Sequence, residues 1–471
     1  MLQTPLFVDL DGTLVKTDVF VESVLTLLRR SPWMVICLPV WLLRGRAVFK
    51  AEVAKRVQPD VATLPLQREF VAYLEREAAS GRRIWLATAS DRGPAEAVAQ
   101  RVGVFSGVLA SDGRQNMKGE RKLEEILATT SNGAFDYAGN ASADYPIWAR
   151  ARRAIVVNPS PGVESGARAR GNVEHVFEDR PGRLRTWIKQ ARIYQWSKNG
   201  LIAVPLLTSH AFTLANVGSV AMAVLAFGLV ASSTYMFNDL LDLASDRQHP
   251  RKRARPFAAG NLSVAQGIVV SVVMFVAGLA VASCLSPMFL LSVGGYAVAT
   301  IAYSTAFKSF MVVDVLLLAG LYTLRILAGA LAIGVQVSSW LLAFSMFLFL
   351  SLALVKRASE LLATDTLHGE HTSGRDYRKG DTATVVSLGT AAGYLSALVL
   401  ALYVESDYVA ANYARPHLLW LLCPVMLYWV SRLWMKTTRG EMHDDPILFS
   451  VRDRGTWVSV IVMATVVLAA L

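Results

Sequence analysis

The sequence predicts two parts of different fold class, an α/β domain in residues 1–182 and an all-α membrane domain in residues 183–471. Apolar residues make up 54% of the 471 residues, and the mean hydropathy of +0.40 is high for a soluble protein. Beyond Trp196, apolar runs of about 17–22 residues recur, and each is long enough to cross roughly 30 Å of hydrocarbon. Earlier in the chain, charged and apolar positions are mixed, and short apolar runs end in polar motifs typical of strands in an α/β domain.

The net charge of +11 is compatible with nucleic-acid binding, but basic cytoplasmic loops explain it better in a membrane protein. We therefore expect no nucleic-acid partner. The three cysteines lie in apolar surroundings without a CxxC spacing, so we expect neither a disulfide framework nor a zinc site. The N-terminus enters a strand-like run at once and lacks the basic region of a signal peptide, which predicts a cytoplasmic first domain.

The first predicted strand, over 6–10, ends in the motif DLDGT at 9–13. Two carboxylates two positions apart at the end of a strand point the same way and can share a cation, as Asp9 and Asp11 would. Gly12 permits the sharp turn that brings the chain over them. The motif therefore predicts a cation-binding site at the end of this strand.

Three further predicted strands also end in polar motifs. They cover 83–87, 134–138 and 154–157, and they lead to Thr88-Ala89-Ser90, to Gly139-Asn140 with Asp144, and to Asn158-Pro159. Lys118 and Lys122 open a helical segment before the third strand. These motifs, in this order, resemble the haloacid dehalogenase superfamily. The resemblance implies a Rossmann-like phosphatase domain with a helical cap over about 19–77.

The same resemblance implies roles for individual residues. Asp9 would be the nucleophile that forms an aspartyl-phosphate, and Asp11 the general acid and base. Thr88 would hold a phosphoryl oxygen and a lysine would neutralise it. We prefer Lys122 to Lys118 for this role, because Lys122 lies deeper at the start of the helix.

The magnesium ligands implied for this domain are Asp9, Asp11, Asn140 and Asp144. The superfamily usually has aspartate where this chain has Asn140. An amide oxygen can still bind Mg²⁺, but the loss of one negative charge should weaken the site. A domain that keeps the fold without the activity is therefore an open alternative.

Within the cap, residues 33–43 form an apolar run that is too short to span a membrane and is broken by Pro39. Tryptophans near both ends and flanking arginines suit the lipid interface, although a buried cap helix explains the run equally well. Residues 160–182 are predicted to be a linker. Residues 184–194 alternate basic and apolar positions as an interfacial helix does.

Nine membrane spans are predicted from the apolar runs. They cover roughly 199–214, 217–237, 264–284, 287–305, 312–333, 338–355, 384–404, 416–435 and 456–471. With the first domain in the cytoplasm, the loops predicted inside carry almost all loop lysines and arginines, and those predicted outside carry only Arg415. This distribution predicts a bacterial inner-membrane protein with an external C-terminus.

The second predicted span ends in the motif NDLLDLASD at 238–246. On a helix, Asp239, Asp242 and Asp246 would lie on one face and repel each other unless a cation lay between them. A divalent metal that bridges a diphosphate is the expected occupant. The basic segment 247–255 that follows suits phosphate capture, and the positive-inside rule also accounts for it.

This acidic motif, followed by Arg255-Pro256 and a turn of small residues, resembles the UbiA superfamily of intramembrane prenyltransferases over nearly all of residues 185–471. Most members have a second acidic motif. Here the matching region has one acid, Asp314, together with Lys308 and the intramembrane Arg325, a costly position for a charge. The pattern is most similar to the decaprenyl-phosphate phosphoribosyltransferase branch.

The resemblance implies a two-step enzyme with Mg²⁺ in both domains. Phosphoribosyl diphosphate would donate 5-phosphoribose to polyprenyl phosphate, and the first domain would remove the 5-phosphate. The acids that would bind the diphosphate through Mg²⁺ are Asp239, Asp242 and Asp246. The residues expected to bind substrate are Lys198, Asn199, Asn238, Arg247, Arg255, Tyr303, Lys308, Asp314, Arg325, Lys356 and Arg357. An aromatic polyprenyltransferase, or a transferase whose first domain only regulates it, are the alternatives.

Overall fold

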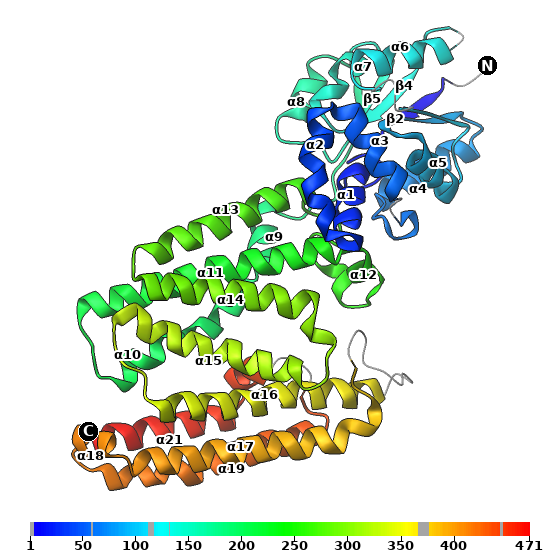
Figure 1. The fold of residues 1–471 in the computed structure, drawn as a ribbon. Coiled ribbons are helices and arrows are strands. Elements are labelled where there is room, and N and C mark those ends of the chain that lie inside the picture. The colour runs from blue at the N-terminus through cyan, green and yellow to red at the C-terminus, as the bar shows by residue number, and fades with distance from the viewer. Residues whose placement is uncertain (1–3, 58–59, 112–116, 131, 366–375, 443–445) are drawn as a thin grey trace. The chain divides into compact units, whose positions relative to one another are not determined.

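The computed structural model describes residues 4–57, 60–111, 117–130, 132–365, 376–442 and 446–471 (Figure 1). Contacts between residues divide the chain into two units. Unit 1 consists of Met1–Arg192 and Tyr235–Val272, and unit 2 consists of Ile193–Thr234 and Val273–Leu471. Residues 235–272, which carry the acidic motif, therefore group with the α/β domain.

Unit 1 is built around a sheet of six parallel strands in the order β3-β2-β1-β4-β5-β6. The strands are β1 (Leu6–Val8), β2 (Ile84–Asp91), β3 (Gly107–Ser111), β4 (Asp136–Gly139), β5 (Arg153–Val157) and β6 (Val173–Phe177). Leu6 pairs with Ile84 on one side and with Asp136 on the other, so β1 is central. The predicted α/β domain with a parallel sheet is thus present.

Helices cover both faces of the sheet, because alternate strand residues point to opposite faces. Leu6 and Val8 pack with Phe70 and Leu74 in one core, whereas Phe7 belongs to the other. The helices that contribute to these cores are α4 (Arg68–Ala79), α5 (Arg92–Val102), α6 (Glu120–Thr129), α7 (Tyr145–Trp148) and α8 (Val163–Arg168).

The linker predicted over 160–182 is wrong, because it contains α8 and the edge strand β6. Val163 and Ala167 of α8 are buried against the sheet, and β6 pairs with β5. In β6, Glu174 and His175 are exposed, so the strand lacks the apolar run by which a buried strand is recognised. The strand β3 was not predicted either.

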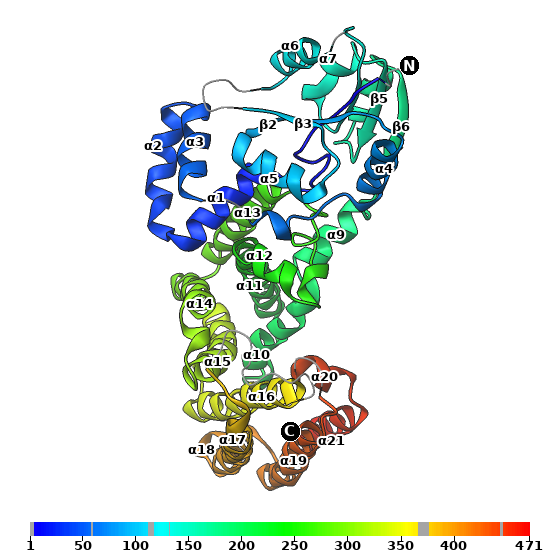
Figure 2. The same ribbon diagram turned by 90° about the vertical axis from the view of Figure 1, so that its right-hand side faces the viewer.

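The cap consists of α1 (Val19–Arg30), η1 (Pro32–Ile36), α2 (Cys37–Leu43), α3 (Arg46–Arg56) and η2 (Val61–Thr63). Helices α1, α2 and α3 pack on one another in both views (Figures 1 and 2). The cap joins the core through two adjacent segments, since Lys16 N–H donates to the Pro65 carbonyl at 2.9 Å and Gln67 N–H to the Leu14 carbonyl at 3.0 Å. The cap therefore ends near residue 66 and not at 77, because α4 packs on the sheet.

The rest of unit 1 is helical. It contains α9 (Arg183–Gln190), the end of α11 (Leu214–Leu241), α12 (Leu243–Gln248), η5 (Lys252–Ala254) and the start of α13 (Val264–Ser283). Leu240 and Phe257 pack around Gly267 of α13, where a Cβ atom would lie 2.5 Å from the Phe257 ring. This contact holds the loop after α11 against the following helix.

Unit 2 is all α. Its elements are η4 (Ile193–Ala203), α10 (Val204–Thr208), most of α11, the end of α13, α14 (Pro287–Thr305), η6 (Phe307–Ser309), α15 (Val313–Ile333), α16 (Ser339–Asp365), η7 (Lys379–Asp381), α17 (Thr382–Val404), α18 (Asp407–Asn412), η8 (Pro416–Leu421), α19 (Leu422–Thr438), α20 (Pro446–Arg452) and α21 (Arg454–Ala470). Within the described residues, seven helical segments are long and apolar enough to cross a membrane. They correspond to seven of the nine predicted spans. The last predicted span corresponds to α21, which is shorter, with 17 residues.

The first predicted span, 199–214, is wrong as a continuous helix. This stretch continues the 3₁₀ segment η4 into the five-residue helix α10. It nevertheless follows α11 in the opposite direction. The Trp196 indole donates to Ser232 at 3.0 Å, and the Asn216 amide donates to the Ala211 carbonyl at 2.9 Å. These contacts are about 24 Å apart along α11 at 1.5 Å per helical residue, so the chain still runs along most of a span.

Candidate functional sites

The first candidate site lies where the strand order of the sheet reverses. Strands β2 and β3 extend to one side of β1, and β4, β5 and β6 extend to the other. Ligands of open parallel sheets bind at such a switch point, beyond the carboxyl ends of the strands. Asp9 and Asp11 follow β1, and Asn140 follows β4, so the topology brings these predicted site residues to one crevice.

Lys122 is the lysine that reaches Asp9. Its ammonium donates to Asp9 Oδ1 at 2.7 Å and to the Tyr137 hydroxyl at 3.0 Å, and its side chain is buried. Lys118 is exposed. The first turn of α6 thus places Lys122 rather than Lys118 at the candidate nucleophile. Tyr137 was not predicted as a site residue, because its hydrogen bonds to Lys122 and Asp144 depend on how β4 packs in the fold.

The two carboxyl groups of the motif have raised pKa values. Burial raises the pKa of Asp9 to about 6, with Lys122 acting against this. Burial also raises the pKa of Asp11 to about 7, although its oxygens accept from Ser90 Oγ at 2.6 Å and from the Val19 N–H at 2.8 Å. A carboxyl group with a pKa near neutrality can deliver and recover a proton, as a general acid and base must.

Asp144 and Thr88 shape the loops of this crevice. Asp144 Oδ2 accepts from the backbone N–H groups of Asn140 and Ala141, both at 3.1 Å, and Oδ1 accepts from the Tyr137 hydroxyl at 2.9 Å. Thr88 is buried, and its hydroxyl accepts from the Ser90 N–H at 3.0 Å. Asp144 therefore fixes the loop that presents Asn140.

The crevice offers the oxygen donors that Mg²⁺ prefers, but few of them. Asp9, Asp11 and the Asn140 amide supply hard oxygen ligands. In the part of the chain that the structure describes, no group of three or more His, Cys, Asp or Glu residues could hold a metal ion. A third ligand would have to be Asn140, which lies against Gly12. A Cβ atom at Gly12, where φ is +78°, would be 2.0 Å from the Asn140 amide nitrogen.

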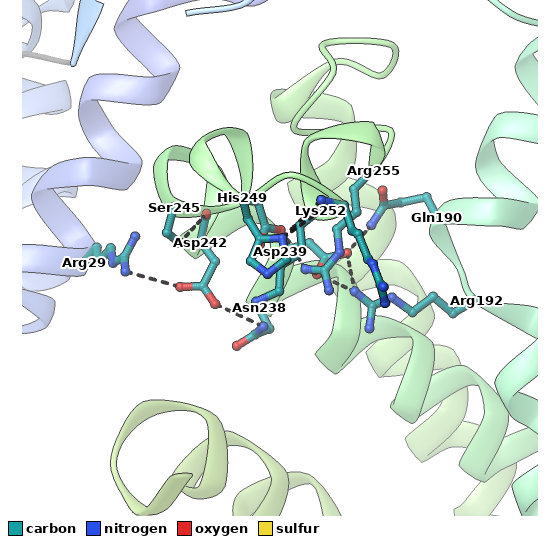
Figure 3. A network of polar contacts seen from close by, with 12 residues as sticks. Arg29, Gln190, Arg192, Asn238, Asp239, Asp242, Ser245, His249, Lys252 and Arg255 are labelled. Atoms are coloured by element: carbon teal, nitrogen blue, oxygen red, sulfur yellow. Dashed lines mark hydrogen bonds and ion pairs between the residues drawn. The ribbon is translucent and has the colours of Figure 1, made fainter. Parts of the chain in front are cut away.

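The second candidate site is the acidic motif at the end of α11 (Figure 3). Asp239 accepts from Gln190 at 2.9 Å, from Arg192 at 2.6 Å and from Arg255 at 3.0 Å. Arg255 also donates to Asp246 at 2.6 Å. Burial raises the pKa of Asp246, and Arg255 opposes this rise. Asp239 and Asp246 thus share a face, as predicted.

Asp242 does not share that face, because the helix breaks there. Helix α11 ends at Leu241, and Asp242 precedes α12 with φ −95° and ψ 10°. Its carboxylate accepts from Asn238 at 3.3 Å and lies 3.4 Å from Arg29 of the cap, on the other side of the turn (Figure 3). The predicted single stripe of three acids is therefore wrong.

A guanidinium lies between Asp239 and Asp246, in the place that the sequence analysis assigns to a metal. Arg255, already a candidate, supplies it, and Arg192 adds a second that the sequence did not reveal. Arg192 has φ +51°, an uncommon conformation for a residue other than glycine, and functional sites are enriched in such residues. The side-chain oxygen of Gln190 is buried and has no hydrogen-bond partner among the described atoms.

Arg247, predicted to bind substrate, is engaged by the cap. Its guanidinium donates two bonds of 2.7 Å to the Glu22 carboxylate and one of 3.0 Å to the Ala258 carbonyl. The Arg247 and Glu22 side chains are 6% and 7% exposed. This buried pair joins α1 to the loop that follows the acidic motif.

In unit 2, three predicted substrate-binding residues come together around Tyr322. Arg325 is buried, donates to Asn199 at 3.2 Å and to the Tyr296 hydroxyl at 2.9 Å, and lies 5.4 Å from the Tyr322 ring centroid. Lys198 lies 5.7 Å from the same centroid. The Asn199 amide nitrogen is buried and has no hydrogen-bond partner among the described atoms. We name Lys198, Asn199, Tyr322 and Arg325 the basic cluster.

Three other predicted binders in unit 2 form a closed network. Arg357 donates to Asp314 at 2.6 Å and to Glu360, and its guanidinium lies 3.3 Å from the Tyr303 hydroxyl. Tyr377 donates to the second oxygen of Asp314 at 2.8 Å. The Arg357 and Asp314 side chains are fully buried, which indicates a structural ion pair. Lys308 and Lys356 are half-buried.

The chain is similar to known proteins over most of its length. It is 35% identical to the uncharacterised protein y4nM of Sinorhizobium fredii over 96% of this chain and 88% of that protein. It is 34% identical to the nodulation protein NoeC of Azorhizobium caulinodans over 59% of this chain and 91% of that protein. It is also 34% identical to decaprenyl-phosphate phosphoribosyltransferase of Corynebacterium glutamicum over 37% of this chain and 54% of that protein.

A family model identifies the membrane part. The model of the UbiA prenyltransferase family matches residues 202–452, which contain the acidic motif and Arg325. The apolar helices of the described residues agree with this assignment. The chain is therefore a multi-pass membrane protein that belongs to the UbiA prenyltransferase family.

Proposed function

We propose that this protein transfers 5-phosphoribose from phosphoribosyl diphosphate to polyprenyl phosphate and then removes the 5-phosphate in its α/β domain. The basic cluster carries the first part of the proposal. A buried arginine within a span, beside a second cation and a buried amide without a partner, is costly unless it serves a polar ligand. Phosphate groups satisfy both cations and accept from the Asn199 amide. The similarity to a decaprenyl-phosphate phosphoribosyltransferase supports phosphoribosyl diphosphate as donor.

The acidic motif would hold the leaving diphosphate. In this proposal Asp239 and Asp246 would hold Mg²⁺, joined by Asp242 once its carboxylate turns to their side, and the ion would supply charge stabilisation for the departing diphosphate. Arg192 and Arg255, which now pair with the acids, would turn to the phosphates as these bind. A lipid phosphate oxygen attacks C1 of the ribose, the bond from C1 to the diphosphate oxygen breaks, and the diphosphate leaves with the electron pair.

The α/β domain would then hydrolyse the phosphomonoester of the lipid-linked product. The pair of Asp9 and Lys122, with Asp11 held near its pKa at neutral pH, supports this step. Asp9 attacks phosphorus, Asp11 protonates the departing ribose oxygen, and the same group then deprotonates the water that cleaves the aspartyl-phosphate. Lys122 would neutralise charge on the phosphoryl group.

The experiment is to incubate the purified full-length protein with labelled phosphoribosyl diphosphate, polyprenyl phosphate and Mg²⁺, and to resolve the lipid products. Wild type should give polyprenyl-phosphoryl ribose and free phosphate. Asp9→Asn should stop at the 5-phosphorylated lipid, and Lys118→Met should behave as wild type because that side chain is exposed. Transfer of a prenyl group to 4-hydroxybenzoate, with phosphoribosyl diphosphate ignored, would refute the donor assignment.

A regulatory α/β domain is the second candidate. Asn140 and the lack of a three-acid metal group among the described residues favour it. On this alternative, wild type and Asp9→Asn would both accumulate the 5-phosphorylated lipid, even at high Mg²⁺. The product comparison therefore separates a phosphatase from a regulatory module without disturbing the transferase.

A further inference from the structure

Exposed apolar side chains are concentrated on one part of the cap. Among the described residues of 4–182, every large apolar side chain that is exposed lies between Trp33 and Val48. Ile36 and Leu43 are 75% and 89% exposed. We name the exposed residues Trp33, Val35, Ile36, Val40, Leu42 and Leu43 the cap face. Such a concentration of exposed apolar side chains marks an interaction surface.

The cap face spans η1 and α2, and α2 is held in one orientation by its packing. Trp41 of α2 is turned inward, is 7% exposed and is covered by Arg56, whose guanidinium carbon lies 4.6 Å from the ring centroid. Trp41 joins Leu27 and Val53 in a core of the cap. Helix α2 therefore buries Trp41 in the core of the cap, and this packing leaves Val40, Leu42 and Leu43 exposed.

Helix α1, which leads into the cap face, contacts the end of a membrane span. Arg29, three residues before Pro32, lies 3.4 Å from Asp242, which directly follows the last residue of α11. A cavity of about 500 Å³ lies between α1 and this helix end. Leu240 and Leu241 line it from the span, and Arg30 lines it from the cap. Glu22 and Asp60 also line it, so apolar, basic and acidic side chains meet at this helix end.

Helix α9 also combines exposed apolar and basic side chains, and it also contacts the end of α11. In α9, Leu184 and Ile188 are exposed, and basic residues alternate with them. Gln190, at the end of α9, donates to Asp239 of α11 at 2.9 Å. Two separate apolar and basic segments of unit 1 thus meet the span within three residues of its end.

We propose that the cap face lies in the headgroup region of the bilayer that α11 spans, with its apolar side chains among the upper lipid chains. Arginines on either side, Arg29, Arg30 and the exposed Arg44, bind anionic lipid phosphates. The occupant of the cap face is the bilayer, because Arg29, near the end of α1 that leads into this face, pairs with Asp242 directly after the apolar helix α11. This proposal concerns the position of the cap and does not depend on what the α/β domain hydrolyses.

The test measures lipid contact directly in the full-length protein. Cys37, Cys284 and Cys423 are replaced by serine, and nitroxide labels are attached at Ile36→Cys or Leu43→Cys. The protein is reconstituted in vesicles of phosphatidylethanolamine and phosphatidylglycerol. The collision rates of each label with oxygen and with a water-soluble nickel chelate are then compared. Val273→Cys, exposed on α13, is the lipid control, and Glu124→Cys, exposed on α6, is the water control.

The labels at positions 36 and 43 should prefer oxygen several-fold, as the label at 273 does, and the label at 124 should prefer nickel. A nickel preference at 36 and 43 would overturn the proposal. Low collision rates with both reagents would also overturn it, because they would mean that a protein surface, such as a second copy of this chain, covers the cap face. Both substituted side chains are exposed, so the labels leave the core of the cap intact.

Discussion

The buried ion pair between Glu22 and Arg247 attaches α12, which carries the end of the acidic motif, to the cap helix α1. The two residues are 225 positions apart in the chain. Both side chains are more than nine-tenths buried, and two bonds of 2.7 Å join them. Glu22→Gln keeps the shape but leaves a buried guanidinium without its counter-charge. Removing one partner of a buried ion pair costs about 3–5 kcal/mol. Because both side chains are buried, solvent does not screen the pair and the full cost is expected.

Hydrogen exchange is the assay for this prediction, because local opening is defined even where global unfolding of a membrane protein is not. A cost of about 3–5 kcal/mol corresponds to a rise of roughly 10²- to 10⁴-fold in the open population of α1 and α12. Glu52→Gln is the matched control in the same cap. Glu52 pairs with Lys55 and Arg56 at the surface, where solvent and salt screen ion pairs and little stability depends on them.

The double variant Glu22→Leu/Arg247→Met should recover most of the protection, because replacing both partners of a buried pair by apolar groups is often neutral. Exchange in Glu22→Gln that is no faster than in Glu52→Gln would refute the reasoning. It would show that water or another residue takes over the charge of Arg247.

Three further predictions concern the two candidate sites and the buried ion pair of unit 2. Asp239→Ala should lower transferase turnover by at least ~10²-fold with Mg²⁺ supplied, as measured by lipid product, whereas the exposed Asp407→Ala should not. Asp314→Asn should destabilise unit 2 by about 3–5 kcal/mol, because Arg357 is buried with it; faster proteolysis checks this, and unchanged proteolysis would contradict a structural pair. Lys122→Met should abolish release of free phosphate while the transfer step continues.

The sheet was predictable where strands are buried and end in motifs. The predicted strands 6–10, 83–87, 134–138 and 154–157 correspond to β1, β2, β4 and β5, because central parallel strands are continuous apolar runs. The edge strand β6 was missed, since Glu174 and His175 are exposed and interrupt its apolar run. The crevice followed from the topology, because strands that end at a switch point bring their motifs together.

The acidic motif shows what periodicity cannot supply. The spacing of Asp239 and Asp246 was sufficient to place them on one face, but it did not predict the break at Asp242, whose carboxylate lies 3.4 Å from Arg29 of the cap. Arg192 could not be found from the sequence either, because its contact with Asp239 joins residues 47 apart in the chain. Arg29 and Arg192, which reach these acids from distant segments, were therefore the part of the site that pattern reasoning left out.

The loop after the acidic motif also meets the connection between cap and core. Gly260 has φ +71°, and a Cβ atom there would lie 2.6 Å from Lys16 Cβ and 3.1 Å from Pro65 Cγ. Lys16 and Pro65 lie on the two segments that join the cap to the core. Opening of the cap requires those segments to move, and the Glu22 pair holds the same loop from the other end. The same loop carries Arg255, which donates to both Asp239 and Asp246, so a continuous set of contacts within unit 1 joins the cap to these two acids.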